Sequence, residues 1–296
     1  MTFDPNADIS RGRVSRRGRT AGITAAGGGI GVVVIFLLSQ LFGVDLSAFV
    51  GGGQAGGGAT GGEEIALEEC RTGADANASV ECRMKGAAAS LDQYWAAAAP
   101  EVGIAYASPQ NVVLFEDQVS TGCGAASAAT GPFYCPPDET IYMDVDFFGE
   151  LRTRFGSSGG PLAEMYVVAH EWGHHVQNLA GILDATRDGL TGADSNAVRT
   201  ELQADCFAGA WAGDASDPRE VGGTPLLEPV TEAQVADALS AAAAVGDDRI
   251  QQAAQGEVSP HTFTHGTSEQ RQRWFTAGYE RGAAACDTFS VPAGGL

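Results

Sequence analysis

Two histidines four residues apart, with a glutamate after the first, form the part of the sequence best suited to metal chemistry. They belong to the His-Glu-Trp-Gly-His run from His170 to His174, inside a stretch from Leu162 to Leu179 that the pattern predicts to be a helix. Histidines at this spacing lie on one helix face, so both imidazoles can bind one metal ion. Glu171 lies beside them, where its carboxylate can take a proton from an attacking water and pass it to a leaving amine. The run therefore predicts a zinc centre suited to hydrolysis.

Two histidines on a solvated helix surface are the alternative explanation of this run. Tyr166, Val167 and Val168 come just before it, and such apolar neighbours indicate a buried helix. Buried histidines need polar partners, and a metal ion is one of them. We therefore favour the metal centre.

A third zinc ligand must come from elsewhere in the chain, because zinc in a hydrolase usually has three protein ligands and one open position. The extended metzincin motif is absent, since Gln177 and Ala180 stand where it requires Gly and His. A second predicted helix, from Asn196 to Trp211, carries Glu201 and Asp205 four residues apart. Glu201 can complete the zinc site, and Asp205 can accept the outer N–H of a ligand histidine and fix its tautomer. A solvated acidic face is the alternative, which the apolar character of this helix disfavours.

Three further histidines remain to be assigned. His175 points about 100° away from His174 around the helix and is expected to be a packing or surface residue. His261 and His265 lie in a turn-rich stretch before the last predicted helix, and either could donate a hydrogen bond to the oxyanion that forms in peptide hydrolysis. We choose His265, which adjoins Gly266 at the start of that helix. A structural histidine that caps the loop is the alternative.

The first 44 residues have the pattern of a membrane anchor. Five arginines precede residue 20, and the run from Thr20 to Val44 has no charged residue, which suits one membrane-spanning helix of roughly 20 residues. By the positive-inside rule we expect a cytoplasmic basic tail at residues 1–20 and a transmembrane helix at 21–44. The catalytic domain of this single-pass cell-membrane protein would then be extracytoplasmic. A cleaved signal peptide is the alternative, although no convincing small-residue cleavage site follows the apolar core.

The rest of the chain divides into a linker and one folded domain. The run from Gly51 to Gly62 is typical of a flexible coil, so we assign residues 45–62 to a Gly-rich linker and 63–296 to the domain. The domain is expected to belong to the α+β class, mainly helical with a small β-sheet. Besides the two helices above, we expect strands at Asn111–Phe115 and Thr140–Met143, and helices at Ala87–Ala99, Thr231–Val245 with Thr231 as N-cap, and Ser268–Gly282.

Charge and cysteine content restrict the partners and the compartment. The net charge is −20, and phosphate backbones would repel so acidic a body, so we expect no nucleic-acid partner. An even number of cysteines in an exported domain suggests disulfides, whose connectivity the sequence leaves open. No CxxC pair occurs, so a cysteine zinc site is not expected. Proximity in the sequence favours the pairs Cys70–Cys82 and Cys123–Cys135, which leaves Cys206 to pair with Cys286.

Together these features resemble one family, the neutral zinc metallopeptidases of bacteria, which are anchored by one N-terminal helix. The resemblance implies a zincin-like fold, a Zn²⁺ cofactor and the Glu-x-x-x-Asp zinc helix that gluzincins share. By matching position it carries over His170, Glu171, His174 and Glu201. The matching stretches are Cys123–Asp138, Ile141–Phe147, Ala163–Gly181, Glu201–Trp211 and His265–Gly278.

The expected function is that of an extracytoplasmic zinc-dependent endopeptidase. Zinc would be held by His170, His174 and Glu201, Glu171 would activate water, and the substrate would be a peptide or protein. A non-catalytic envelope protein that zinc only stabilises is one alternative, which the presence of Glu171 disfavours because a closed structural site does not need it. A zinc hydrolase of a non-peptide amide is another, and it would use the same ligands.

Overall fold

The structure, a computed structural model, describes residues 2–17, 64–215 and 225–296. The predicted transmembrane helix at 21–44 and the predicted linker at 45–62 lie outside the described residues. Within the described ranges, no helix combines the length and the apolar character that a membrane span requires. The membrane helix therefore stays a prediction.

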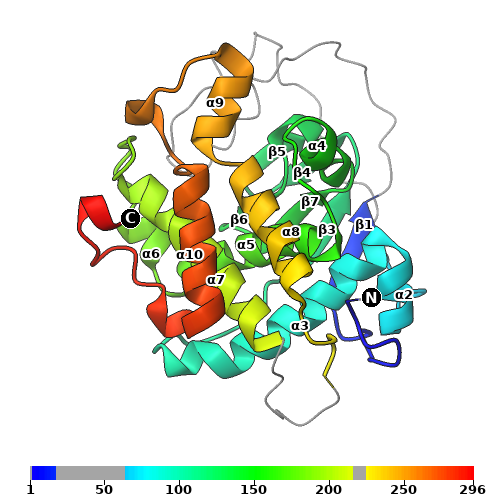
Figure 1. Cartoon of the computed structure of the whole chain (residues 1–296). Helices are drawn as coiled ribbons and strands as arrows, with labels where there is room; N and C mark the ends of the chain where they lie inside the picture. Colours follow the sequence, from blue (N-terminus) through cyan, green and yellow to red (C-terminus); the bar gives the residue numbers. More distant parts are fainter. Residues whose placement is uncertain (1, 18–63, 216–224) are drawn as a thin grey trace.

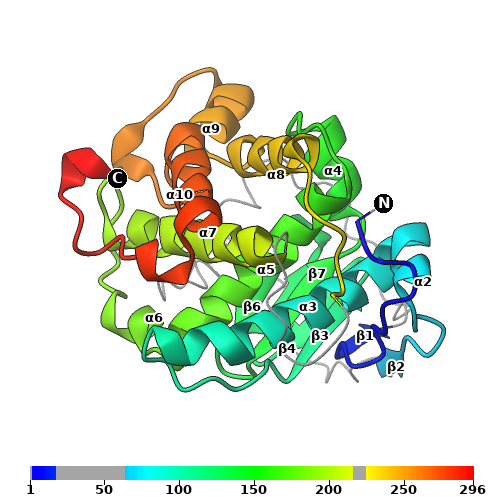
Figure 2. The same cartoon turned by 60° about the horizontal axis from the view of Figure 1, so that its bottom comes forward.

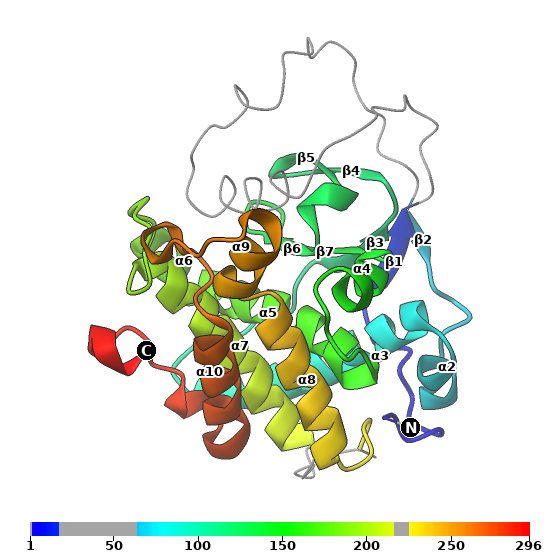
Figure 3. The same cartoon turned by 45° about the horizontal axis from the view of Figure 1, so that its top comes forward.

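One layer of the fold is a five-stranded mixed sheet, in the order β2-β1-β3-β7-β6 (Figure 3). Its central strands β1, β3 and β7 are parallel, while the outer strands β2 and β6 run antiparallel to their neighbours. A separate two-stranded hairpin, β4 with β5, precedes β6. The strands are β1 (Val14–Arg17), β2 (Glu64–Ala66), β3 (Asn111–Phe115), β4 (Gln118–Thr121), β5 (Gly124–Ser127), β6 (Phe133–Cys135) and β7 (Thr140–Asp144).

Helices form the larger part of the fold, with α5 between the sheet and the helices α7 and α8. Helix α5 contacts α7, α8, α3 and the strands β6 and β7, while α10 packs on α7 and α8 (Figure 1). The expected α+β class is therefore confirmed. The helices are α2 (Gly73–Ala78), α3 (Val80–Glu101), α4 (Phe147–Thr153), α5 (Pro161–Leu179), α6 (Ile182–Ala185), α7 (Asn196–Ala215), α8 (Glu232–Ala244), α9 (Asp247–Gln255) and α10 (Ser268–Arg281).

Helix α5 is predicted almost residue for residue because its ends carry strong local signals, whereas α7 begins at the predicted Asn196 and extends four residues beyond the predicted end at Trp211. Pro161 occupies the first turn of α5, and the left-handed Gly181 (φ 71°) follows its end. The expected N-cap Thr231 of α8 is also confirmed, since its side chain accepts a hydrogen bond from the backbone of Gln234.

Glycines let the site helices approach closely. A Cβ on Gly173 of α5 would lie 3.0 Å from the Cα of Ala204 in α7. A Cβ on Gly278 of α10 would overlap the backbone oxygen of Cys206 in α7. Helix α7 therefore lies between α5 and α10 at distances that larger side chains would prevent.

Residues 2–17 belong to the folded domain, so the expected boundary of the domain at residue 63 leaves out a segment that the fold includes. Strand β1 forms hydrogen bonds with β2 on one side and β3 on the other, and the side chains of Phe3 and Ile9 are 0% exposed. Asn77 of α2 accepts hydrogen bonds from the backbone N–H groups of Thr2 and Phe3. Figure 2 shows this segment running past α2 to β1. The apolar residues of this segment are few and are widely spaced among its arginines. Its sequence pattern therefore did not indicate that it is part of the core.

Three disulfides close the fold, and they are the two pairs that proximity favoured and the one that remained. Cys70–Cys82 ties the chain before α2 to α3, and Cys123–Cys135 ties the β4–β5 turn to β6. Cys206–Cys286 ties α7 to the segment after α10.

If the N-terminal segment is part of the core, replacing Ile9 by Ala should destabilise the domain. Removal of a fully buried isoleucine side chain costs about 2–5 kcal/mol of unfolding free energy. Thermal or urea unfolding of Ile9→Ala, beside Asn6→Ala at an exposed position of the same segment, measures the effect. Equal stability of the two variants would show that the segment does not contribute to the core.

Candidate metal centre

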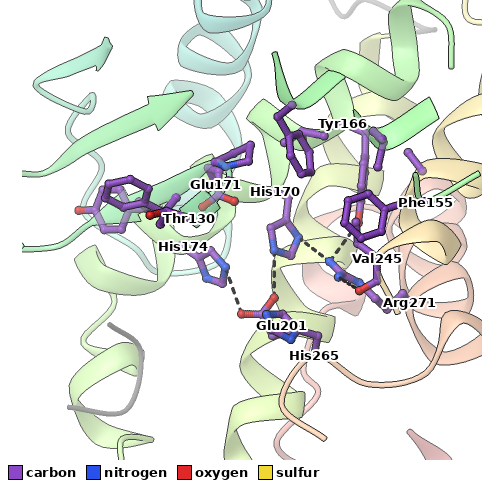
Figure 4. Close-up of a pocket in the computed structure, with 18 of the residues that line it drawn as sticks. Thr130, Phe155, Tyr166, His170, Glu171, His174, Glu201, Val245, His265 and Arg271 are labelled. Atoms are coloured by element: carbon purple, nitrogen blue, oxygen red, sulfur yellow. Dashed lines mark hydrogen bonds and ion pairs between the residues drawn. The ribbon is translucent and has the colours of Figure 1, made fainter. Parts of the chain in front are cut away.

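The structure brings His170, His174 and Glu201 together at one point between α5 and α7 (Figure 4). One ligand atom from each residue lies within 4.8 Å of the other two. The Nε2 atom of His170 is 3.1 Å from Oε2 of Glu201, and Nε2 of His174 is 3.4 Å from Oε1 of the same carboxylate. All three side chains are buried.

This group fits a zinc ion in donor type and in spacing. Two imidazole nitrogens and one carboxylate form a ligand set that zinc hydrolases use, and they leave a fourth position open. Ligand atoms about 2.1 Å from a tetrahedral zinc lie about 3.4 Å from one another. The observed separations of 3.1 and 3.4 Å are close to that value.

His170 is oriented from behind by Asp205, the residue predicted for this role. The Nδ1–H of His170 donates to Oδ1 of Asp205 at 2.8 Å, which leaves Nε2 for a metal. Tyr166 donates to the same oxygen, and Arg271 of α10 donates to both carboxylate oxygens. Burial opposes a charged His170, but the carboxylates of Asp205 and Glu201 outweigh it and raise the pKa of His170 to about 10.

His174 is oriented in the same way by an amide. Its Nδ1–H donates to Oε1 of Gln177 at 2.9 Å. The amide nitrogen of Gln177 in turn donates to the backbone oxygen of Thr200 and to Gln203, so its orientation is fixed. Gln177 therefore orients His174 so that its Nε2 atom faces the metal position. The same residue distinguishes this sequence from the metzincin motif.

Glu171 lies in the same pocket but outside the ligand group. Its side chain is buried, and this burial raises the pKa of its carboxyl, an effect that His174 and His170 oppose. The backbone of Tyr134 in β6 also acts to lower the pKa of this carboxyl. A buried carboxylate in contact with the site but not committed to a metal can exchange protons there.

Two of the remaining histidines lie where the sequence analysis expected them. His265 lines the pocket that contains the ligands, whereas the exposed His261 does not. His175 is a packing residue whose Nε2–H donates to the backbone oxygen of Ala107 at 2.8 Å. Its Nδ1 accepts from the hydroxyl of Tyr134, which joins β6 to α5.

The profile of the family described as "putative neutral zinc metallopeptidase" matches residues 5–289. The chain belongs to this family. It is 56% identical over 227 residues to the uncharacterized protein Rv2575 of Mycobacterium tuberculosis, with 76% of each chain covered. It is 37% identical over 269 residues to the uncharacterized protein YpfJ of Escherichia coli K12, with 88% of this chain and 86% of YpfJ covered. No solved structure matches the chain.

Membership of this family confirms the predicted resemblance and extends it to the N-terminal segment. The matched range begins at residue 5 and so includes most of the segment that forms β1. This agrees with the structure, in which residues 2–17 are part of the domain.

Sequence reasoning missed the orienting roles of three side chains, Gln177, Asp247 and Arg271. Asp247, at the start of α9, accepts backbone hydrogen bonds from Thr264, His265 and Gly266, and its other oxygen is 3.3 Å from Nδ1 of His265. Arg271 lies in one of the stretches that carried the family resemblance, but spacing alone could not connect it with a carboxylate 66 residues earlier.

Asp205→Asn should weaken zinc binding, because the neutral amide no longer strengthens His170 as a ligand and leaves the charge of Arg271 without its partner. Loss of such a supporting carboxylate typically lowers metal affinity about 10–100-fold. Competition with a chromophoric chelator measures the zinc dissociation constant, with the exposed Asp184→Asn as the matched control. An unchanged constant in a folded Asp205→Asn protein would contradict this role.

Proposed function

We propose that this protein is a zinc-dependent endopeptidase in which Glu171 is the general base. The observation that carries the proposal is the position of Glu171, which shares a buried pocket with His170, His174 and Glu201 without joining their group. A metal site that only stabilised a fold would be closed by its ligands and would have no use for a further buried carboxylate.

His170, His174 and Glu201 would hold the zinc ion, which when bound polarises a carbonyl and makes water easier to deprotonate. Glu171 would take a proton from the attacking water at its carboxylate oxygen and later deliver it to the leaving amine. Asp205 and Gln177 would keep both imidazoles in the tautomer that presents Nε2. The burial of the site excludes bulk water from these proton transfers.

His265 would stabilise the negative charge that develops on the substrate oxygen. Asp247 lies at Nδ1 of His265 and fixes the backbone on both sides of it, which leaves Nε2 as the ring atom available to the pocket. A donor fixed before the reaction begins stabilises an oxyanion without reorganisation.

A peptide substrate is supported by the description of the family, which names metallopeptidases. The two alternatives, a zinc-stabilised protein without activity and a hydrolase of a non-peptide amide, are outcomes of the same experiment.

Glu171→Gln should retain zinc and lose peptide hydrolysis, because the amide keeps the shape of the side chain but accepts no proton. Removal of a general base typically lowers kcat about 10²–10⁴-fold. Zinc content and cleavage of a quenched fluorescent peptide library are measured on the full chain, with Glu201→Gln as the variant expected to lose zinc as well. Cleavage by Glu171→Gln at the wild-type rate would exclude Glu171 as the base. A zinc-loaded wild-type protein that cleaves no peptide would favour the alternatives.

We also propose that the domain acts outside the cytoplasm, attached to the cell membrane through the apolar residues 21–44. The three disulfides support this location, because such bonds persist in oxidising compartments. The sheet restricts the side of the membrane on which the N-terminal segment can lie. Strand β1 can pair with β2 and β3 only if residues 14–17 are in the same compartment as the domain. A cytoplasmic N-terminus, an extracytoplasmic domain and this sheet cannot occur in one molecule. We therefore place residues 2–17 on the outer side with the domain, an arrangement in which residues 21–44 attach to the membrane from that side and do not cross it once.

Epitope tags at the two ends of the chain test this placement. In spheroplasts treated with a protease that does not cross the membrane, both tags should be digested. Protection of both tags would contradict an extracytoplasmic domain. Protection of the N-terminal tag alone would show that the single-pass arrangement holds and that β1 does not pair in the membrane-bound protein.

A further inference from the structure

One wall of the pocket beside the candidate ligands is apolar. Leu151 and Phe155 contribute from α4 and the residues after it, Val167 from α5, and Val245 and Ile250 from the chain around α8 and α9. In the view of Figure 4, Phe155 and Val245 lie on one side of His170 and Glu171 lies on the other. A substrate group bound at the ligands would therefore have this wall next to it.

The apolar wall is fixed relative to the metal position. Val167 precedes His170 by three residues, so the two side chains lie on the same face of α5. The backbone oxygen of Val245 accepts a hydrogen bond of 3.1 Å from Arg271, which also binds Asp205. The distance between wall and ligands is therefore set by buried contacts.

The size of the pocket matches a large side chain. Its volume is about 140 Å³. An apolar protein cavity of about 150 Å³ binds benzene. The pocket, whose volume includes the space next to the candidate ligands, therefore has room for a phenyl ring or a branched aliphatic side chain along the wall, and a methyl group would leave more of it vacant.

The charges around the pocket disfavour a charged side chain. Among the described residues that line it, the acidic ones are Glu171 and Glu201, and both are committed to the site. A basic side chain would either lose its hydration without a partner or occupy the general base. An acidic side chain would be repelled by the same carboxylates. Of the three described arginines that line the pocket, Arg271 is bound to Asp205, Arg154 pairs with Glu150, and Arg187 is exposed to solvent.

We infer that the pocket selects a peptide with a bulky apolar residue, aromatic or branched aliphatic, next to the bond that is cleaved. This inference rests on the proposed peptidase function and names its substrate class. The acidity of the protein, with a net charge of −20, does not extend into the pocket, so recognition depends on apolar contact.

A peptide series tests the inference directly. The zinc-loaded full chain is assayed with peptides that differ only in the two residues flanking the cleaved bond, each being Phe, Leu, Ala, Lys or Glu. At one of the two positions, kcat/KM for Phe or Leu should exceed that for Ala at least about tenfold, and Lys and Glu should be poorer than Ala. Equal rates for all residues, or a preference for Lys or Glu, would overturn the inference.

Variants of the wall locate the selectivity. Ile250→Asp should lower kcat/KM for the Phe peptide at least about tenfold and raise that of the Lys peptide relative to it, because it adds a carboxylate to the wall. The matched control is Ile65→Asp, which adds the same charge at an exposed position of β2, the sheet edge opposite β6. If both variants change the Phe-to-Lys ratio equally, the wall is not the determinant.

Inhibitor binding separates failure of this inference from failure of the proposed function. Phenylalanine hydroxamate and lysine hydroxamate are titrated calorimetrically into zinc-loaded Glu171→Gln, which needs no turnover. Tighter binding of the phenylalanine compound supports the apolar pocket even if no peptide is cleaved, in which case the peptidase function alone fails. Equal binding, or tighter binding of the lysine compound, overturns the pocket inference even if peptides are cleaved.

Discussion

The buried ion pair between Asp205 and Arg271 joins the three helices on which the site depends. Asp205 lies on α7, Arg271 on α10, and the shared partners Tyr166 and His170 on α5. A buried charge is tolerated only when it is paired and hydrogen-bonded, so each of these groups needs the others in place. The same contacts that satisfy the carboxylate also fix the ring of His170. Helix packing and ligand geometry are therefore set by one network.

Helix α7 shows how one helix serves both stability and chemistry. Glu201 and Asp205 face α5 one turn apart, Cys206 forms the disulfide to Cys286, and Gly209 lets the backbone of α10 approach. These demands leave almost no solvent-facing surface in the middle of the helix, where residues 200–212 are all buried. Glu201 and Asp205 are therefore buried, and the alternative of a solvated acidic face on this helix is excluded.

The position of the N-terminal segment in the sheet restricts how the chain can be arranged at a membrane. Strand β1 is an inner strand, so the sheet would lose its order if residues 14–17 were held elsewhere. The arginines of this segment suit a cytoplasmic tail, yet Arg17 also binds Glu64 of β2 at 2.7 Å. Charge composition alone cannot distinguish these two uses, because an arginine at a sheet edge and an arginine at a membrane surface are the same residue in the sequence.

The sequence by itself determined the helices that carry the site, three ligand candidates, the candidate base and the two disulfide pairs that close short loops. These follow from local rules: a spacing of four residues on a helix, a proline or glycine at a helix end, and short separations between cysteines. Only the tertiary structure decided that Asp247, Gln177 and Arg271 orient the histidines, that β1 belongs to the sheet, and that an apolar wall borders the ligands. Those facts join residues that are far apart in the chain, or that give no periodic signal, and only packing in three dimensions brings them together.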